Sequence, residues 1–148
     1  MPKDEAMTIL QTSADFEACL NGDMSNFDNV AQPLYSAMVK DILRQKERLG
    51  GDFAIAHAVA TRHSRDNIRK AMGKDVIFII LSLTRKCQEK RILGRHGENV
   101  EFGDFMDKFY DLYEPAGKDE PNAFNVTIDD NESKSDVLLK VLNLIKHI

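Results

Sequence analysis

The apolar residues of this chain follow two different patterns, and these patterns separate candidate strands from candidate helices. The run at 53–60 is apolar except for His57, which is typical of a strand buried on both faces of a parallel sheet. The run at 76–83 is rich in β-branched and aromatic residues and gives the strongest strand signal, and 123–128 is a third short candidate strand. Elsewhere, apolar residues recur at helical spacing. This spacing predicts helices over 33–49, 102–113 and from Ser133 onward. Two short basic helices are predicted over 64–72 and 86–95, each of which ends close to a glycine.

The order of these elements predicts the fold class. Strand and helix alternate from residue 52 to the end of the sequence, which indicates an α/β protein with a parallel sheet flanked by helices. Residues 1–30 show no long period because Asp, Asn and Ser interrupt it, so we expect an irregular N-terminal segment. Within it, 6–10 fits a helix or a strand. We therefore predict one domain over 1–148, with its core over 33–148.

Composition limits the classes of protein to consider. The chain has 148 residues, of which 43% are hydrophobic and 30% charged, as expected for one globular domain. Its net charge of −4 argues against general nucleic-acid binding. No apolar run approaches the roughly 18 residues of a membrane span, and the N-terminus does not resemble a signal peptide. Cys19 and Cys87 have no metal-ligand spacing, so we expect reduced thiols, a cytoplasmic location and no metal held by the protein.

A basic segment directly follows the run at 53–60. It contains Arg62, Arg65 and Arg69 together with Asp66. In a parallel sheet, ligands bind beyond the carboxyl ends of the strands, and arginine binds carboxylate or phosphate through two hydrogen bonds. A helix N-terminus also favours an anion. The segment is therefore a candidate anion clamp, or else a solvated basic helix face in which Asp66 pairs with an arginine.

A second basic segment follows the run at 76–83. It has five basic residues between Arg85 and Arg95. Arg91 and Arg95 are four residues apart and therefore share one helix face, from which they would contact a polyphosphate or stack on a purine. The alternative is again a solvated charged face.

The third segment, 112–120, is acidic and contains Glu114 and Pro115. Its acids would order the loop or hold the basic segments in place. The alternative is an acidic surface turn that Pro and Gly terminate. Within the first apolar run, we interpret His57 as a hydrogen-bonded core histidine.

Taken in order, the three segments resemble the back part of gluconate kinase and its relatives. The resemblance covers roughly 52–148 and is carried by Arg62, Arg65-Asp66, Arg69, Arg91, Arg95, Glu114-Pro115 and Asp119-Glu120. These relatives are small P-loop kinases, similar in architecture to shikimate and adenylate kinases. The resemblance implies a three-layer fold, a sugar-acid or polyol acceptor, and ATP with magnesium as cofactors if the chain is active.

The resemblance also implies a role for each segment. Arg62, Arg65, Asp66 and Arg69 fall on the stretch that binds the acceptor substrate. Arg91 and Arg95 fall on the catalytic lid and nucleotide-facing arginines. Glu114 and Pro115 fall on a loop at the nucleotide side.

The phosphate loop of that family is absent. Gly-Lys occurs only at Gly73-Lys74 and Gly117-Lys118, and Asp follows each pair. The loop's Lys and Ser/Thr neutralise phosphate charge and hold Mg²⁺, so their loss predicts a weak or inactive kinase-like protein. The alternative is a non-catalytic module, derived from a P-loop kinase, that binds a ligand or partner. Its candidate partners are a small anionic ligand or nucleotide and a second copy of the chain, with no nucleic acid and no membrane.

The strand that normally carries the phosphate loop is missing as well. Three arrangements would compensate for it: the runs at 53–60 and 76–83 pair directly, residues 6–10 supply a strand, or another chain covers the gap. A further possibility is that the sequence is a truncated product of a complete kinase.

Overall fold

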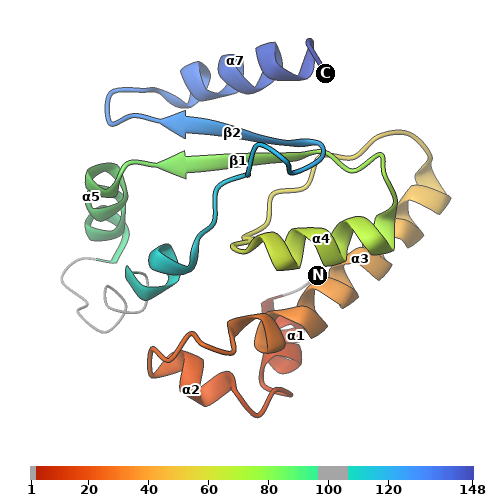
Figure 1. The fold of residues 1–148 in the computed structure, drawn as a ribbon, viewed down its shortest axis with the longest axis vertical. Coiled ribbons are helices and arrows are strands. Elements are labelled where there is room, and N and C mark those ends of the chain that lie inside the picture. Colours follow the sequence, from red (N-terminus) through yellow and green to blue (C-terminus); the bar gives the residue numbers. More distant parts are fainter. Residues whose placement is uncertain (1–2, 97–106) are drawn as a thin grey trace. The chain divides into compact units, whose positions relative to one another are not determined.

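The structure, a computed structural model, describes residues 3–96 and 107–148. It is a mixed helix–strand protein with a small two-stranded parallel sheet flanked by helices (Figure 1). The chain divides into two compact units. Unit 1 comprises Met1–Val76 and Asp104–Glu114, and unit 2 comprises Ile77–Gly103 and Pro115–Ile148. None of the described helices is long and apolar enough to cross a membrane.

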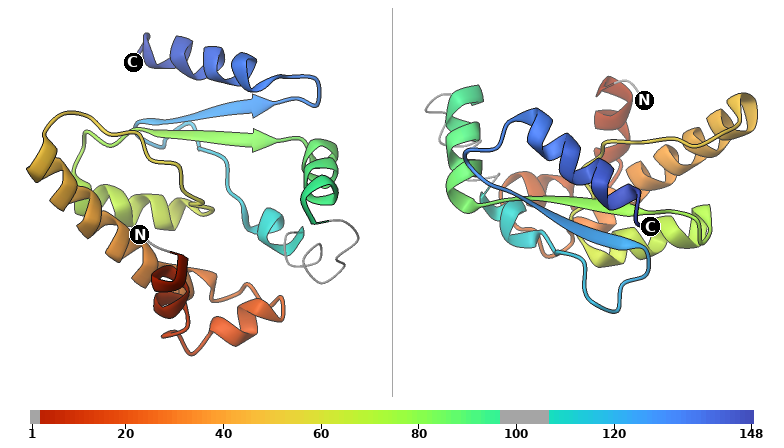
Figure 2. Two further views of the ribbon diagram at one scale, coloured as in Figure 1. Left: turned by 180° about the vertical axis from the view of Figure 1, so that it is seen from behind. Right: turned by 90° about the horizontal axis from the view of Figure 1, so that it is seen from above.

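Unit 1 is helical in its described part. It contains α1 (Lys3–Leu10), α2 (Phe16–Leu20), α3 (Phe27–Leu49), α4 (Arg62–Met72) and a helical stretch at 107–112. Helix α3 packs against α1, α2 and α4 (Figure 2). The buried apolar side chains of this unit are Cys19, Val30, Ala31, Tyr35, Val39, Ile42, Ala60 and Ile68.

Helix α3 is longer than the 33–49 that we predicted, because its buried face begins with Val30 and Ala31. Pro33 lies inside the helix and has no N–H to donate to the preceding turn. Gly50 ends the helix with a φ of 67°, a conformation that glycine adopts without strain.

The predicted strand over 53–60 is wrong. These residues have no strand assignment and are mostly exposed, including Phe53 and Ile55. A strand requires a pairing partner, and its composition alone cannot provide one. His57 is consequently exposed rather than a core residue, with its ring against the edge of Tyr35 at 5.7 Å between centroids.

The N-terminal segment is also more ordered than predicted, because α1 and α2 lie within residues 1–30. Residues 6–10 belong to α1 and so do not supply a substitute strand. Short helices of this kind carry too few turns to produce a clear period in the sequence.

Unit 2 contains the sheet, and here the predictions are confirmed. Strand β1 (Phe78–Leu83) pairs in parallel with β2 (Ala123–Ile128), in a register that joins Phe78 to Ala123 and Leu83 to Ile128. Helix α5 (Arg85–His96) follows and contacts β1, and α7 (Lys134–Ile145) follows and contacts β2 (Figure 1). Ser133 and Asp136 form the predicted capping box at the start of α7. The predicted helix over 102–113 lies partly outside the described residues.

Candidate functional site

The N-terminus of α4, where the first basic segment begins, is capped by side chains of unit 1. Thr61 is the N-cap, and its hydroxyl oxygen accepts a hydrogen bond from the Ser64 N–H at 3.1 Å. The hydroxyls of Thr61 and Ser64 both donate to Oδ1 of Asp28, at 2.7 and 2.8 Å. The carboxylate of Asp28 therefore lies against the first turn of α4.

Glu114 is joined to the same turn through its backbone and its side chain. Its Oε2 accepts the Arg62 N–H at 2.6 Å, and its own N–H donates to the Ala60 carbonyl at 2.9 Å. Nη1 of Arg65 donates to the Glu114 carbonyl at 2.9 Å and to the Ala60 carbonyl at 3.4 Å. Among the alternatives for the acidic segment, the contacts of Glu114 match the one in which an acid holds a basic segment in place.

The three arginines of α4 are engaged within unit 1. Arg65 is fully buried, with 0% of its surface exposed. Asp66 forms an ion pair with Arg69 at 2.6 Å and a longer one with Arg62 at 3.6 Å. Of the four predicted acceptor-binding residues, the structure joins Arg62, Asp66 and Arg69, whereas Arg65 is buried and bonded to backbone carbonyls. It confirms the pairing of Asp66 with arginine.

The residues behind this turn were not found from the sequence. Burial and the nearby Asp28 carboxylate raise the pKa of Tyr35 to about 12. Its hydroxyl donates to the Ala58 carbonyl at 2.9 Å and fixes the segment that leads into α4. Asp28 and Tyr35 lie on α3, and no local motif links them to Thr61, 33 and 26 positions further along.

The second basic segment forms α5 in unit 2. Cys87 and Gln88 are buried, whereas Arg91 is exposed. Arg85 pairs with Glu89 at 3.4 Å. The side chain of Arg95 lies outside the described part of the structure, so the pairing of Arg91 and Arg95 on one face stays a prediction.

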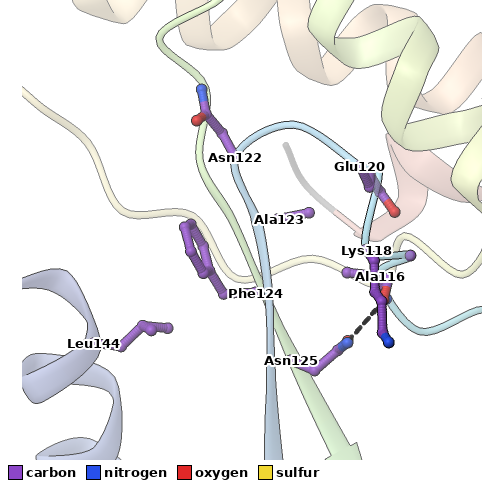
Figure 3. A pocket seen from close by; sticks show the side chains of 9 residues that line it. Ala116, Lys118, Glu120, Asn122, Ala123, Phe124, Asn125 and Leu144 are labelled. Carbon is purple, nitrogen blue, oxygen red and sulfur yellow. Dashed lines mark hydrogen bonds between the residues drawn. The ribbon is translucent and has the colours of Figure 1, made fainter. Parts of the chain in front are cut away.

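Unit 2 also contains a cavity of about 390 Å³ beside the loop that follows Pro115 (Figure 3). The loop is fixed by two hydrogen bonds: the Ala116 N–H donates to Oδ1 of Asn125 at 2.8 Å, and Nδ2 of Asn125 donates to the Ala116 carbonyl at 2.9 Å. The lining combines charged, amide and apolar side chains: Lys118, Glu120, Asn122, Asn125, Phe124 and Leu144, with small residues between them.

The cavity and α5 lie toward different ends of the sheet. The cavity is lined by the first three residues of β2, whereas α5 follows the last residues of β1. Because β1 and β2 are parallel, their amino ends share one edge and their carboxyl ends the other. Within unit 2, Arg91 is therefore not part of the cavity that follows Pro115.

The resemblance implies that the chain would hold magnesium and ATP. Among residues 3–96 and 107–148, no group of three or more His, Cys, Asp or Glu side chains is placed to hold a metal ion. The arginines of α4 have internal partners, and Asp28 and Glu114 add negative charge beside them. The start of α4 therefore does not fit an additional polyphosphate group.

The fold defines a class, a helix–strand protein in which a parallel strand pair is flanked by helices. Comparisons with protein-family models, with characterised proteins and with solved structures find no match for this chain.

Proposed function

We propose that this chain is a P-loop-kinase-like α/β protein that no longer transfers phosphoryl groups and serves as a ligand-binding module. The observation that carries the proposal is the position of Glu114 and Asp28 at the first turn of α4. At this turn the carboxylates of Glu114 and Asp28 accept the hydrogen bonds that an anionic acceptor substrate would otherwise accept.

The physical reason concerns charge. Phosphoryl transfer depends almost entirely on positioning and on stabilising negative charge on the moving group. An anionic substrate at the start of α4 would lie close to two carboxylates, and like charges within a few ångströms repel each other. Arg65 offers no compensation, because it is buried and bonded to two backbone carbonyls.

The kinase-like ancestry is supported by the order of elements in unit 2. Each of the two parallel strands leads directly into a helix that contacts it, as in three-layer α/β proteins. The second basic segment follows β1, as the resemblance implies, whereas the first follows 53–60, which is not a strand. The lack of a phosphate loop in the sequence agrees with a loss of phosphoryl transfer.

We assign the ligand of this module to the cavity of unit 2. The ring of Phe124 lies along the cavity, and Lys118 provides a positive charge on its wall (Figure 3). A cavity of about 390 Å³ falls at the lower end of the range for small-molecule sites. A small ligand with a planar ring, an anionic group for Lys118 and a hydrogen-bond donor for Glu120, such as a nucleotide, matches this combination of groups.

A second candidate function is an ATP-dependent kinase for sugar acids or polyols. It is favoured by the exposure of Arg91 on a helix that follows the carboxyl end of β1. In this alternative, Arg91 and Arg95 offset charge on the transferred phosphoryl group.

The two functions are separated by measuring ATP turnover with Mg²⁺ and a panel of sugar acids and polyols. We expect no turnover above the protein-free rate. Turnover that is lost in Arg91→Ala and retained in Lys90→Ala would replace our proposal with the kinase. Both side chains are exposed on α5, so the pair differs mainly in the proposed role.

The ligand is tested separately by calorimetric titration with ADP. We expect binding that is at least tenfold weaker in Lys118→Ala and unchanged in Lys134→Ala, an exposed lysine outside the cavity lining. The absence of ADP binding in the folded protein would remove nucleotides as the ligand.

A further inference from the structure

Helix α7 exposes a row of large aliphatic side chains. Leu138, Leu139, Leu142 and Ile145 are 57%, 58%, 43% and 50% exposed, and Ile148 just beyond the helix is 51% exposed. We call these five residues the outer patch of α7. No residue of α7 is buried, although this helix is among the most apolar of the chain.

The outer patch is not the side of α7 that contacts the sheet. Val137, Val141 and Leu144 are less exposed and recur at the spacing of a second helix face. Lys140 holds the helix against β2 by donating to the Thr127 carbonyl at 3.0 Å, and it also pairs with Glu132. A helix with apolar residues on two sides is typical of one that is covered on both.

We propose that the outer patch of α7 is a self-association surface, through which two copies of the chain pair about a two-fold axis. The five residues expose on the order of 500 Å² per copy, so two copies would bury on the order of 1,000 Å² of this patch, about the lower limit for a biological interface and in the range of weak, micromolar association. An exposed apolar area of this size on a single protein commonly marks an interaction site.

The chemistry of the outer patch fits a second copy of the chain. Leu138, Leu142 and Ile145 follow the i, i+4, i+7 spacing of a helix–helix seam. All five residues are uncharged and aliphatic, so the patch has no group that would favour a charged partner. A two-fold axis places identical apolar surfaces together, which requires no charge complementarity.

Sedimentation equilibrium of the intact chain tests the proposal over micromolar to high-micromolar concentrations. We expect a mass that approaches twice the 16.8 kDa of one chain. The variant Leu142→Glu is expected to weaken association at least tenfold. Leu49→Glu is the matched control, since Leu49 is a 61% exposed leucine on α3 and should leave association unchanged. A single-chain mass at every concentration overturns the proposal.

A cysteine variant answers the same question if the glutamate variant does not fold. Leu142→Cys should form an intermolecular disulfide under oxidation, whereas Leu49→Cys should not, and the native Cys19 and Cys87 are buried. Equal cross-linking of both variants, or a dimer in which only Leu49→Cys cross-links, excludes α7 as the interface. The outer patch would then be covered by a different protein.

Discussion

Units 1 and 2 differ in which of their side chains are buried and which are exposed. Unit 1 buries a complete arginine, two hydroxyl side chains and a tyrosine, and it satisfies them with its own carbonyls and carboxylates. Unit 2 keeps Arg91 and the aliphatic outer patch of α7 exposed and surrounds an open cavity. The comparison teaches that the most chemically suggestive sequence segment, around Arg65, is the most structural part of the protein. The less suggestive α7 offers the better candidate for contact with a partner.

Substitutions of arginine should show the largest difference in stability effect between the two units. Arg65→Ala removes a fully buried side chain together with its hydrogen bonds to the Glu114 and Ala60 carbonyls, so we expect a loss of about 3 kcal/mol in the free energy of unfolding. Arg91→Ala removes an exposed side chain and should change the free energy of unfolding by less than about 0.5 kcal/mol. Urea unfolding followed by circular dichroism measures both, and equal effects would contradict the structural role of Arg65.

Alkaline pH should act on unit 1 through Tyr35. Burial raises the pKa of this phenol to about 12 from 10.0, so its stabilising contribution is fully present below pH 10. Between pH 10 and 12 the unfolded phenol ionises first, and stability falls by about 1.4 kcal/mol per pH unit. Tyr35→Phe should remove this dependence while it costs about 1 kcal/mol at neutral pH, because the bond to Ala58 is lost. An unchanged alkaline slope in Tyr35→Phe would assign the effect to other groups.

Helix caps provide a smaller contrast between the units. Thr61 caps α4 from a buried position and also donates to Asp28, so Thr61→Ala should cost about 2 kcal/mol. Ser133 caps α7 from an exposed position, so Ser133→Ala should cost about 1 kcal/mol or less. Thermal and urea unfolding compare the pair. If Ser133→Ala lowers the free energy of unfolding more than Thr61→Ala does, the buried hydrogen bonds of Thr61 at the start of α4 do not have the stabilising role proposed here.

Two glycines should respond with opposite signs. Gly73 follows α4 with a φ of 97°, so Gly73→Ala strains the backbone and should destabilise by about 1 kcal/mol although its Cβ has space. Gly94 lies inside α5, where an alanine Cβ would have no atom within 4 Å of those considered. Gly94→Ala should therefore raise the free energy of unfolding by about 0.5–1 kcal/mol. Stabilisation by both substitutions would show that the turn after α4 relaxes without strain.

The elements of unit 2 could be predicted because their signals are local. The run at 76–83, the run at 123–128 and the Ser133–Asp136 capping box each carry their own pattern, and all three are confirmed. The run at 53–60 looked equally local, yet a strand also depends on a neighbour elsewhere in the chain, and none of the described strands pairs with it. Composition records the preference of a segment and not the identity of its partner.

The candidate site was predictable only in part for the same reason. The grouping of Arg62, Arg65, Asp66 and Arg69 follows from helical spacing, and so does the pairing of Asp66. The approach of Asp28 and Glu114 to the start of α4 spans more than thirty residues in one direction and about fifty in the other. No periodicity reports such a contact, although it decides whether the arginines face a ligand or the protein itself.

Pro33 gives α3 an uneven resistance to solvent exchange. The helix lacks an amide hydrogen at that position, so the carbonyl one turn earlier does not receive the usual hydrogen bond from residue 33. The residues before Pro33 are thereby coupled less tightly to the long remainder of α3. Deuterium should therefore enter the helix from its first two turns, well before it reaches the amides around Val39 and Ile42.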